Sequence, residues 1–89
     1  MADVRLNRIS IILAEFNFSQ KDLADFLSVN ENTVSRWCNN KTQPEIRTMY
    51  KIADFFRINH QYLYEATSWE NNDTEPPYKI YMANKNQRR

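Results

Sequence analysis

The segment from Ser19 to Lys41 constrains the fold of this 89-residue chain most strongly, because it carries start signals for two short helices. Ser19 and Asp22 form a capping pair: the hydroxyl accepts from a free amide, and the carboxylate sits at the positive end of the helix dipole. Asn30 serves both as a turn residue and as the cap of a second helix, with Thr33 at the reciprocal position. The pattern predicts a helix, a tight turn and another helix.

The two faces of the second predicted helix differ in chemistry. Val34 and Trp37 lie three residues apart and share one apolar face. The opposite face carries hydrogen-bonding side chains of short and long reach, namely Glu31, Asn32, Ser35 and Arg36. This arrangement indicates a helix that packs on one side and offers polar groups on the other.

A longer pattern surrounds these helices. It reads Ser-Gln-x-x-Leu-Ala-x-x-Leu-x-Val-x-x-x-Thr-Val-Ser-Arg-Trp from Ser19 to Trp37, followed by Asn39, Lys41, Pro44 and Lys51-Ile52-Ala53. From about Asn7 to Glu65 the chain therefore resembles the phage-repressor-like helix-turn-helix family, also called XRE or Cro/repressor type. The resemblance implies an all-α, compact five-helix bundle (a lambda-repressor-like DNA-binding domain) that binds specific DNA sequences, most often as a transcriptional repressor. Gly is frequent in that family where Asn40 stands here.

Apolar spacing and caps predict the remaining elements of the bundle. We expect a first helix over about Val4–Phe16 with Leu6 in its apolar stripe, a recognition helix over about 30–39, and a fourth helix over about Glu45–Phe56 with Ile46 facing inward. A brief fifth helix should cover His60–Glu65, with Asn59 as its cap and Leu63 pointing inward.

The composition changes after residue 66, which predicts a DNA-binding domain over residues 1–66 and a C-terminal tail over 67–89. Pro76 and Pro77 rule out a helix continuing across them. Tyr78, Ile80 and Met82 alternate with other residues, which is compatible with one short strand. A lone strand is unstable, so the tail is either disordered or an arm that pairs with a second chain or lies on the bundle.

Composition excludes several classes of function. The chain has no Gly, so it has no glycine-rich phosphate loop and no dinucleotide fingerprint. Positive-φ positions are therefore expected to fall on Asn. One Cys and one His give neither a zinc site of ordinary spacing nor an internal disulfide. We predict no metal, no cofactor and no enzyme activity, with Cys38 as a small, partly buried residue.

Sequence patterning also bears on location and partners. No apolar run approaches the length of a membrane span, which predicts a soluble, cytoplasmic protein. A formal net charge of +1 is weak support for nucleic-acid binding. The aromatic residues exceed the needs of one small core, which favours a protein interface: Tyr50, Phe55, Tyr62, Tyr64, Trp69, Tyr78 and Tyr81.

The resemblance assigns base contacts in the major groove to Glu31, Asn32 and Arg36, with Asn30, Thr33 and Ser35 close by. The chemistry agrees, because Arg can donate twice to guanine, Asn can pair with adenine, and Glu can accept from cytosine. The alternative is an ordinary solvated face. Glu31 is discordant, since a carboxylate is repelled by phosphate and would act as a filter on sequence.

Phosphate contacts fall, by the same resemblance, on Gln20, Asn39 and Lys41. Lys21 and Arg47 are less direct members of this set, for which a role in solubility is an equal alternative. Such contacts position a protein on the duplex and make its affinity depend on salt.

These observations lead to one interpretation and one rival. The first is a specific duplex-DNA-binding repressor that acts as a homodimer on two half-sites about 34 Å apart. The rival is a protein-interaction module on the same fold, such as an antitoxin or a partner of another regulator, with DNA binding secondary or lost. The near-neutral charge and Glu31 favour the rival, whereas Arg36, Lys41 and the intact caps oppose it.

Overall fold

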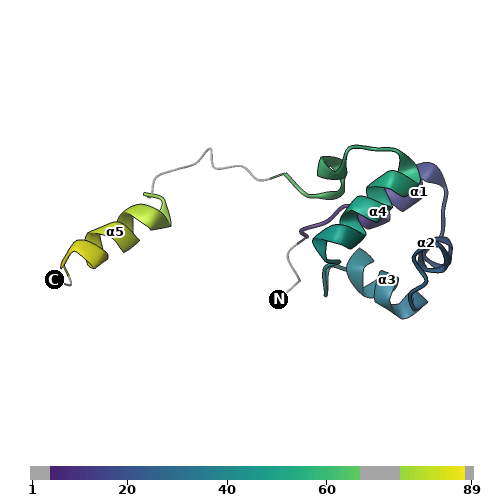
Figure 1. Cartoon of the computed structure of the whole chain (residues 1–89), viewed down its shortest axis with the longest axis horizontal. Coiled ribbons are helices and arrows are strands. Elements are labelled where there is room, and N and C mark those ends of the chain that lie inside the picture. Colours follow the sequence, from purple (N-terminus) through teal and green to yellow (C-terminus); the bar gives the residue numbers. More distant parts are fainter. Residues whose placement is uncertain (1–4, 67–74, 88–89) are drawn as a thin grey trace.

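The computed structural model describes residues 5–66 and 75–87, and its regular elements in these ranges are all helical (Figure 1). They are α1 (Ile9–Phe16), α2 (Gln20–Leu27), α3 (Glu31–Cys38), α4 (Ile46–Phe56), the 3-10 helix η1 (His60–Leu63) and α5 (Pro77–Gln87). The first four helices and η1 form the expected compact bundle. The predicted all-α fold class is confirmed.

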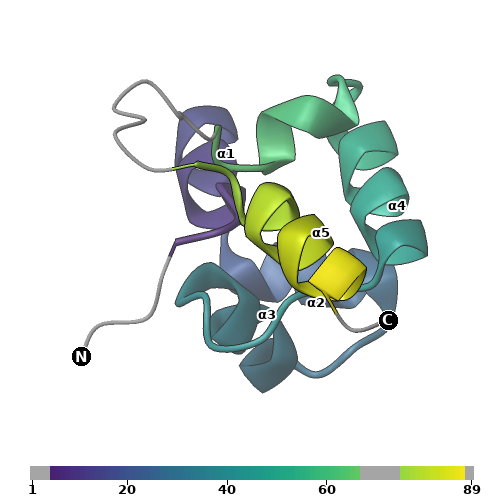
Figure 2. The ribbon, with the colours of Figure 1, turned by 90° about the vertical axis from the view of Figure 1, so that its left-hand side faces the viewer.

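The bundle packs around one apolar core. α1 and α4 lie on one side, and α2 and α3 lie on the other (Figures 1 and 2). α2 packs on both α3 and α4, α1 packs on α3, and η1 packs on α4. The largest fully buried apolar side chains come from α1, α2, α3, α4 and η1 in turn: Ile9, Leu23, Val34, Ile52 and Leu63. Every element of the bundle therefore contributes to one core.

A residue in the left-handed conformation ends α1, α2 and α4, and another follows one residue after the C-cap of α3. Asn17 and Asn40 occupy two of these positions, as expected, but Ser28 and Arg57 occupy the others, with φ of 58° and 54°. The expectation that such positions fall on Asn is therefore wrong at Ser28 and Arg57. In the turn after α2, the N–H of Ser28 donates to Asp25 O and the N–H of Val29 donates to Ala24 O. These bonds satisfy free carbonyl groups at the helix end, which offsets the steric cost of the Cβ atom.

The first helix begins later than its apolar spacing predicts. α1 starts at Ile9 rather than near Val4, and Leu6 is exposed instead of lying in the apolar stripe. The segment before α1 is held extended beside the chain that follows η1: Arg8 N donates to Leu63 O at 2.8 Å, and Glu65 N donates to Leu6 O at 2.9 Å. Tertiary pairing thus overrides a helical pattern at this end.

Asn7 is the buried polar residue of the bundle, with only 1% of its surface exposed. Its Nδ2 donates to Trp37 O at 2.9 Å and to Gln43 Oε1 at 2.7 Å, while its Oδ1 accepts from Ile9 N at 3.0 Å. Asn40 completes the group, because its Oδ1 accepts from the N–H groups of Leu6 (2.7 Å) and Asn7 (2.9 Å). We call Asn7, Asn40 and Gln43 the asparagine network. It ties the N-terminal segment to the end of α3.

The remaining helix predictions are close to the structure. Glu45 caps α4 instead of opening it, and Ile46, expected to face inward, is exposed. Its position in the first turn of α4 places it outside the core. The fifth helix is a short 3-10 turn that ends at Leu63, which is buried as predicted, and the Asn59 side chain accepts from Gln61 N at 2.9 Å.

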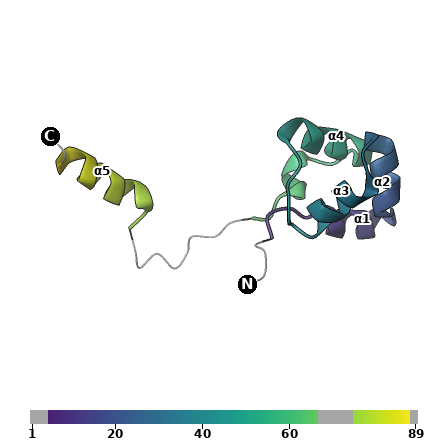
Figure 3. The same cartoon turned by 90° about the horizontal axis from the view of Figure 1, so that it is seen from below.

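The tail contains a helix, so the short strand considered for Tyr78 to Met82 is wrong. α5 starts at Pro77, a favourable first helical residue because the missing N–H has no helical partner there. No helix crosses Pro76 and Pro77, as expected, because α5 begins at Pro77. α5 lies apart from the bundle in Figures 1 and 3. Trp69 lies outside the described residues, and the division into residues 1–66 and 67–89 stays a prediction.

We predict that Asn7→Asp destabilises the bundle by at least about 3 kcal/mol at neutral pH, because it buries a carboxylate against two acceptors. Part of the loss should be regained on acidification. The buried carboxyl would have a raised pKa in the folded state, so the folded state binds the proton more tightly, and the protonated group can donate to Trp37 O.

Urea unfolding between pH 4 and pH 8 measures this effect, with Asn40→Asp as the matched control. A carboxylate at position 40 still accepts from Leu6 N and Asn7 N, so its effect should be much smaller. Equal losses for the two variants would contradict the role given to the Asn7 amide.

Candidate nucleic-acid interface

The start of α2 is fixed by a complete capping box. Asp22 N donates to Ser19 Oγ at 3.0 Å, and Ser19 N donates to Asp22 Oδ2 at 2.9 Å. The hydrogen bonds from the backbone and side chain of Ser19 lower the pKa of the Asp22 carboxyl. This box is the one that the sequence predicts, and it sets where the first turn of α2 begins.

α3 is capped by Asn30, whose Oδ1 accepts from Asn32 N at 2.7 Å. The capping role of Asn30 is confirmed, but the side-chain bond goes to Asn32 N and not to Thr33. The turn between α2 and α3 therefore depends on two devices, the left-handed Ser28 and the Asn30 cap. Together they fix the angle at which α3 leaves α2. Figure 3 looks onto the face of the bundle that α3 forms.

The faces of α3 separate as the sequence predicts except at Ser35, which was expected on the exposed face and is half-buried. Val34, Trp37 and Cys38 are buried in the core. At about 100° of rotation per residue, Asn32 and Arg36 lie most nearly opposite these three side chains. Both are exposed, as are Asn30 and Glu31, whereas Thr33 and Ser35 are half-buried on the flanks of the helix. Asn32 and Arg36 are thus the side chains that α3 presents most directly outward.

Gln20 lies near the end of α3. It is half-buried in the first turn of α2, and its side chain lies close to the Cys38 thiol. Burial raises the pKa of this thiol, which keeps it protonated. Cys38 is therefore a packing residue, and the neighbouring cations do not make it reactive. Gln20 is held close to the loop that follows α3.

That loop carries the other predicted phosphate contacts. Asn39 and Lys41 are both exposed and flank Asn40, whose side chain belongs to the asparagine network. The backbone also closes tightly here, because Lys41 N donates to Arg36 O at 2.9 Å. The loop is consequently anchored on both sides of the two candidate side chains.

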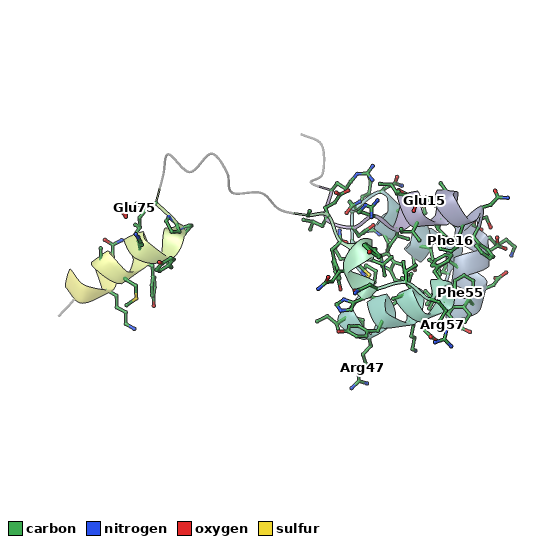
Figure 4. The ribbon with its side chains drawn as sticks, turned by 90° about the horizontal axis from the view of Figure 1, so that it is seen from above. Glu15, Phe16, Arg47, Phe55, Arg57 and Glu75 are labelled. Atoms are coloured by element: carbon green, nitrogen blue, oxygen red, sulfur yellow. The ribbon has the colours of Figure 1, made fainter. Side chains whose placement is uncertain are left out.

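The cations divide into two groups. Arg5, Lys21 and Arg57 make exposed ion pairs with Glu65, Asp25 and Asp54, at 3.7, 3.7 and 3.3 Å. None of the ion pairs within residues 5–66 and 75–87 involves Arg36, Lys41 or Arg47. Arg47 points away from the bundle at the start of α4 (Figure 4). The second group can meet a phosphate without first breaking a salt bridge.

The structure thus brings together the exposed residues of α3, Gln20, Asn39 and Lys41 around one motif. Lys21 follows Gln20 on α2 but pairs with Asp25, and Arg47 lies on α4, outside the motif. Sequence reasoning missed the asparagine network that supports the motif. Asn7 and Gln43 are ordinary polar residues in the sequence, and no local pattern shows that they meet. Of these three residues, only Asn40 stood out in the sequence, because it was expected to adopt a positive φ.

Two further findings concern the described ranges. No helix in them is long and apolar enough to span a membrane. No group of three or more His, Cys, Asp or Glu in the same ranges is arranged to hold a metal ion.

Comparison with known proteins agrees with this geometry. Residues 9–63, which extend from the first residue of α1 to the last of η1, match a family model described as helix-turn-helix. A crystal structure described as that of a candidate DNA-binding protein from Bacteroides fragilis has 38% sequence identity and a TM-score of 0.66. That match covers 67% of this chain and 97% of the other.

A transcriptional regulator from Listeria innocua shares the fold, with a TM-score of 0.61 at 19% identity over 97% of this chain and 81% of the other. No curated protein matches the chain significantly.

We predict that Asp22→Asn lowers stability at neutral pH and that the difference from the wild type shrinks as the pH falls. The folded-state pKa of Asp22 is lowered, so its contribution is complete above the ordinary carboxyl pKa and is lost as the pH drops through the folded pKa. Thermal unfolding between pH 2 and pH 7 measures the effect. Asp25→Asn on the same helix is the control, since its ion pair with Lys21 is exposed. A stability difference between Asp22→Asn and the wild type that does not change with pH would contradict the capping assignment.

Proposed function

Because the chain belongs to the XRE-type helix-turn-helix family, we propose that it is a DNA-binding transcription regulator that acts in the cytoplasm. In this proposal α3 lies in the major groove of duplex DNA, and the protein is a repressor that occupies a promoter. The observation that carries the proposal is the exposure of Asn32 and Arg36 on the outward face of α3. Hydrogen bonds of Asn30 at the start of this helix and of Asn40 just after its end hold the helix in place.

Base recognition follows from side-chain chemistry. Arg36 can donate to both acceptors of a guanine edge, and Asn32 can pair with an adenine edge, each with about 1–3 kcal/mol of discrimination. Their spacing of four residues puts them on one face, one turn apart, so they reach successive base pairs. Glu31, Asn30, Thr33 and Ser35 are the flanking candidates on the same helix.

Phosphate contacts surround this face. Lys41 supplies a charge without an intramolecular carboxylate partner in the described ranges, and Asn39 supplies an amide. Gln20 sits in the first turn of α2, where free backbone N–H groups favour an anion. Because the loop is held by the asparagine network, these groups are positioned before DNA arrives. Lys21 and Arg47 would add less specific attraction.

The proposed regulator is a homodimer on a palindromic operator. One α3 presents few base contacts, so a single copy would read only a short half-site. Two copies related by a two-fold axis would read half-sites about 34 Å apart, one turn of the double helix. Dimerisation doubles the set of base contacts and the number of phosphate contacts.

A protein-interaction role is the second candidate, favoured by two observations. Residues 1–66 carry eight Lys and Arg against eight Asp and Glu, so the bundle has no net charge. α5 also presents exposed apolar side chains that pack on none of the bundle helices. In this alternative the tail binds a different protein, and DNA binding is secondary.

Selection from randomised duplex DNA at two salt concentrations tests the proposal. We expect enrichment of a palindromic site, with an affinity that falls steeply as salt rises. Arg36→Ala should abolish the enrichment at one position in each half-site, while Lys51→Ala, an exposed cation on α4, serves as the control. Absence of enrichment at both salt concentrations would contradict the DNA-binding proposal and favour the protein-interaction role.

We further expect Glu31→Ala to relax sequence preference more than it weakens binding, because the carboxylate repels phosphate and rejects bases that offer no donor. Preference at one base pair should fall by about five- to a hundredfold, while affinity for the best site changes much less. Glu31→Gln, which keeps an acceptor without the charge, separates the two effects. Unchanged base preferences in Glu31→Ala would remove Glu31 from the recognition set.

A further inference from the structure

One end of the bundle carries a group of phenylalanines that the core does not enclose. Phe16, Phe18 and Phe26 are 42%, 41% and 48% exposed. Phe26 and Phe18 lie 4.4 and 5.3 Å from the ring of the half-buried Phe55, and Phe16 lies 4.7 Å from the ring of Phe56, all between centroids. We call Phe16, Phe18, Phe26 and Phe55 the phenylalanine patch. Exposed aromatic rings gathered on one surface favour an interaction site.

Acidic residues adjoin the patch. Glu15, Asp25 and Asp54 each directly precede one of its phenylalanines, and Figure 4 shows Glu15 beside Phe16. Asp25 and Asp54 are paired with Lys21 and Arg57, but these ion pairs are largely exposed and therefore weak. The rim thus offers carboxylates to a basic partner.

α5 has the complementary chemistry. Tyr78, Tyr81 and Met82 share one face by their spacing of three and four residues, and they are 64%, 63% and 45% exposed. We call these three side chains the α5 stripe. Lys85 continues the same face one turn further on, and residues 76–89 contain no acidic residue. Tyr and Met side chains pack well on aromatic rings, and Lys85 can meet a rim carboxylate.

α5 also needs a partner for a thermodynamic reason. Isolated helices shorter than about 12–15 residues are marginal in water, and α5 has 11 residues. Its packing on none of the bundle helices leaves its apolar side chains in solvent. A surface that covers the α5 stripe would stabilise the helix itself.

Chain length argues for a second copy rather than the same one. Figure 4 places Phe16 and Phe55 at the end of the bundle farthest from the point where the chain leaves toward α5. The ten residues from Thr67 to Pro76 span at most about 33–36 Å when fully extended. The two shorter dimensions of the molecule are 29 and 27 Å, and a path over the surface is longer than either width. Docking on the chain's own patch would therefore demand an almost fully extended tether.

We propose that the α5 stripe of one copy docks on the phenylalanine patch of a second copy, and that the contact is reciprocal. The proposal rests on the homodimer of the proposed function and names the surface that holds it together. Each patch offers on the order of 250 Å² of exposed phenylalanine surface, taking about 200 Å² for a whole phenylalanine. With the matching surface of α5 and the two-fold repetition, the dimer reaches about 1,000 Å², the lower bound for a specific interface.

Analytical ultracentrifugation of the full chain without DNA tests the contact. We expect a dimer at micromolar concentration whose Kd rises at least about thirtyfold in Tyr78→Ser/Tyr81→Ser, since buried Tyr residues dominate interface energetics. Ile80→Ser is the matched control, because Ile80 is exposed on the opposite side of α5. Its Kd should stay within about threefold of the wild type, because surface changes outside a contact alter free energies by about 0.5 kcal/mol or less.

Complementation makes the test specific for the two surfaces. Phe26→Ser should also dimerise weakly while keeping the helical circular dichroism of the bundle. Mixed with Tyr78→Ser/Tyr81→Ser, it should form a heterodimer tighter than either homodimer, because one intact stripe then meets one intact patch. A monomeric wild type, an unaffected double variant, an equal effect of Ile80→Ser or no recovery on mixing would each overturn the proposal.

DNA selection separates this result from the proposed function. A wild-type monomer that still enriches a single half-site would reject the dimer contact and keep the DNA-binding proposal. A dimer that depends on the α5 stripe but enriches no DNA would do the reverse.

Discussion

The buried amide of Asn7 is the interaction on which the arrangement of this bundle depends. A fully desolvated side-chain amide is tolerated only when its donors and acceptors are all satisfied, and here Trp37, Gln43 and Ile9 satisfy them. The same residue brings its backbone N–H to Asn40. Because each partner belongs to a different part of the chain, one side chain fixes the start of α1, the end of α3 and the following loop at once. An apolar residue at this position would fill the space but leave these backbone groups unpaired.

The absence of Gly makes the helix ends a second constraint. Each of α1, α2 and α4 ends at a left-handed residue that is not Gly, and the carbonyls of its last turn accept from the following N–H groups. These hydrogen bonds, together with the apolar residue that follows each of these ends, offset the steric cost. Asn17 and Asn40 reach this conformation readily, whereas Ser28 and Arg57 are held there by the bonds and by packing. The helices are short, so their ends decide how they cross.

These two constraints also position the side chains of the candidate interface. Asn32 and Arg36 project from α3 because Val34, Trp37 and Cys38 occupy the core side of the same helix. Lys41 lies in a loop closed by Asn40, and Gln20 lies in a turn closed by the capping box of Ser19. The side chains proposed to meet DNA are thus exposed, while the backbone that carries them is tightly bonded. The phenylalanine patch and the α5 stripe are the opposite case, in which apolar groups remain in solvent and require a partner.

The sequence by itself determined the local features of this protein. Caps at Ser19, Asn30 and Asn59, the apolar face of α3 and the extent of α4 follow from rules that act over three or four residues, so one chain was enough to find them. Only the tertiary structure decided where α1 begins and that Ile46 and Leu6 are exposed. It also brought Asn7 to Asn40 and gathered Phe16, Phe26 and Phe55 at one end of the bundle. Such outcomes depend on contacts between distant parts of the chain, and no local pattern encodes those partners. In the asparagine network the bonded residues are 30 or more positions apart. The physical reason is that hydrogen bonds and apolar burial are satisfied in space, whereas propensity and capping act along the chain.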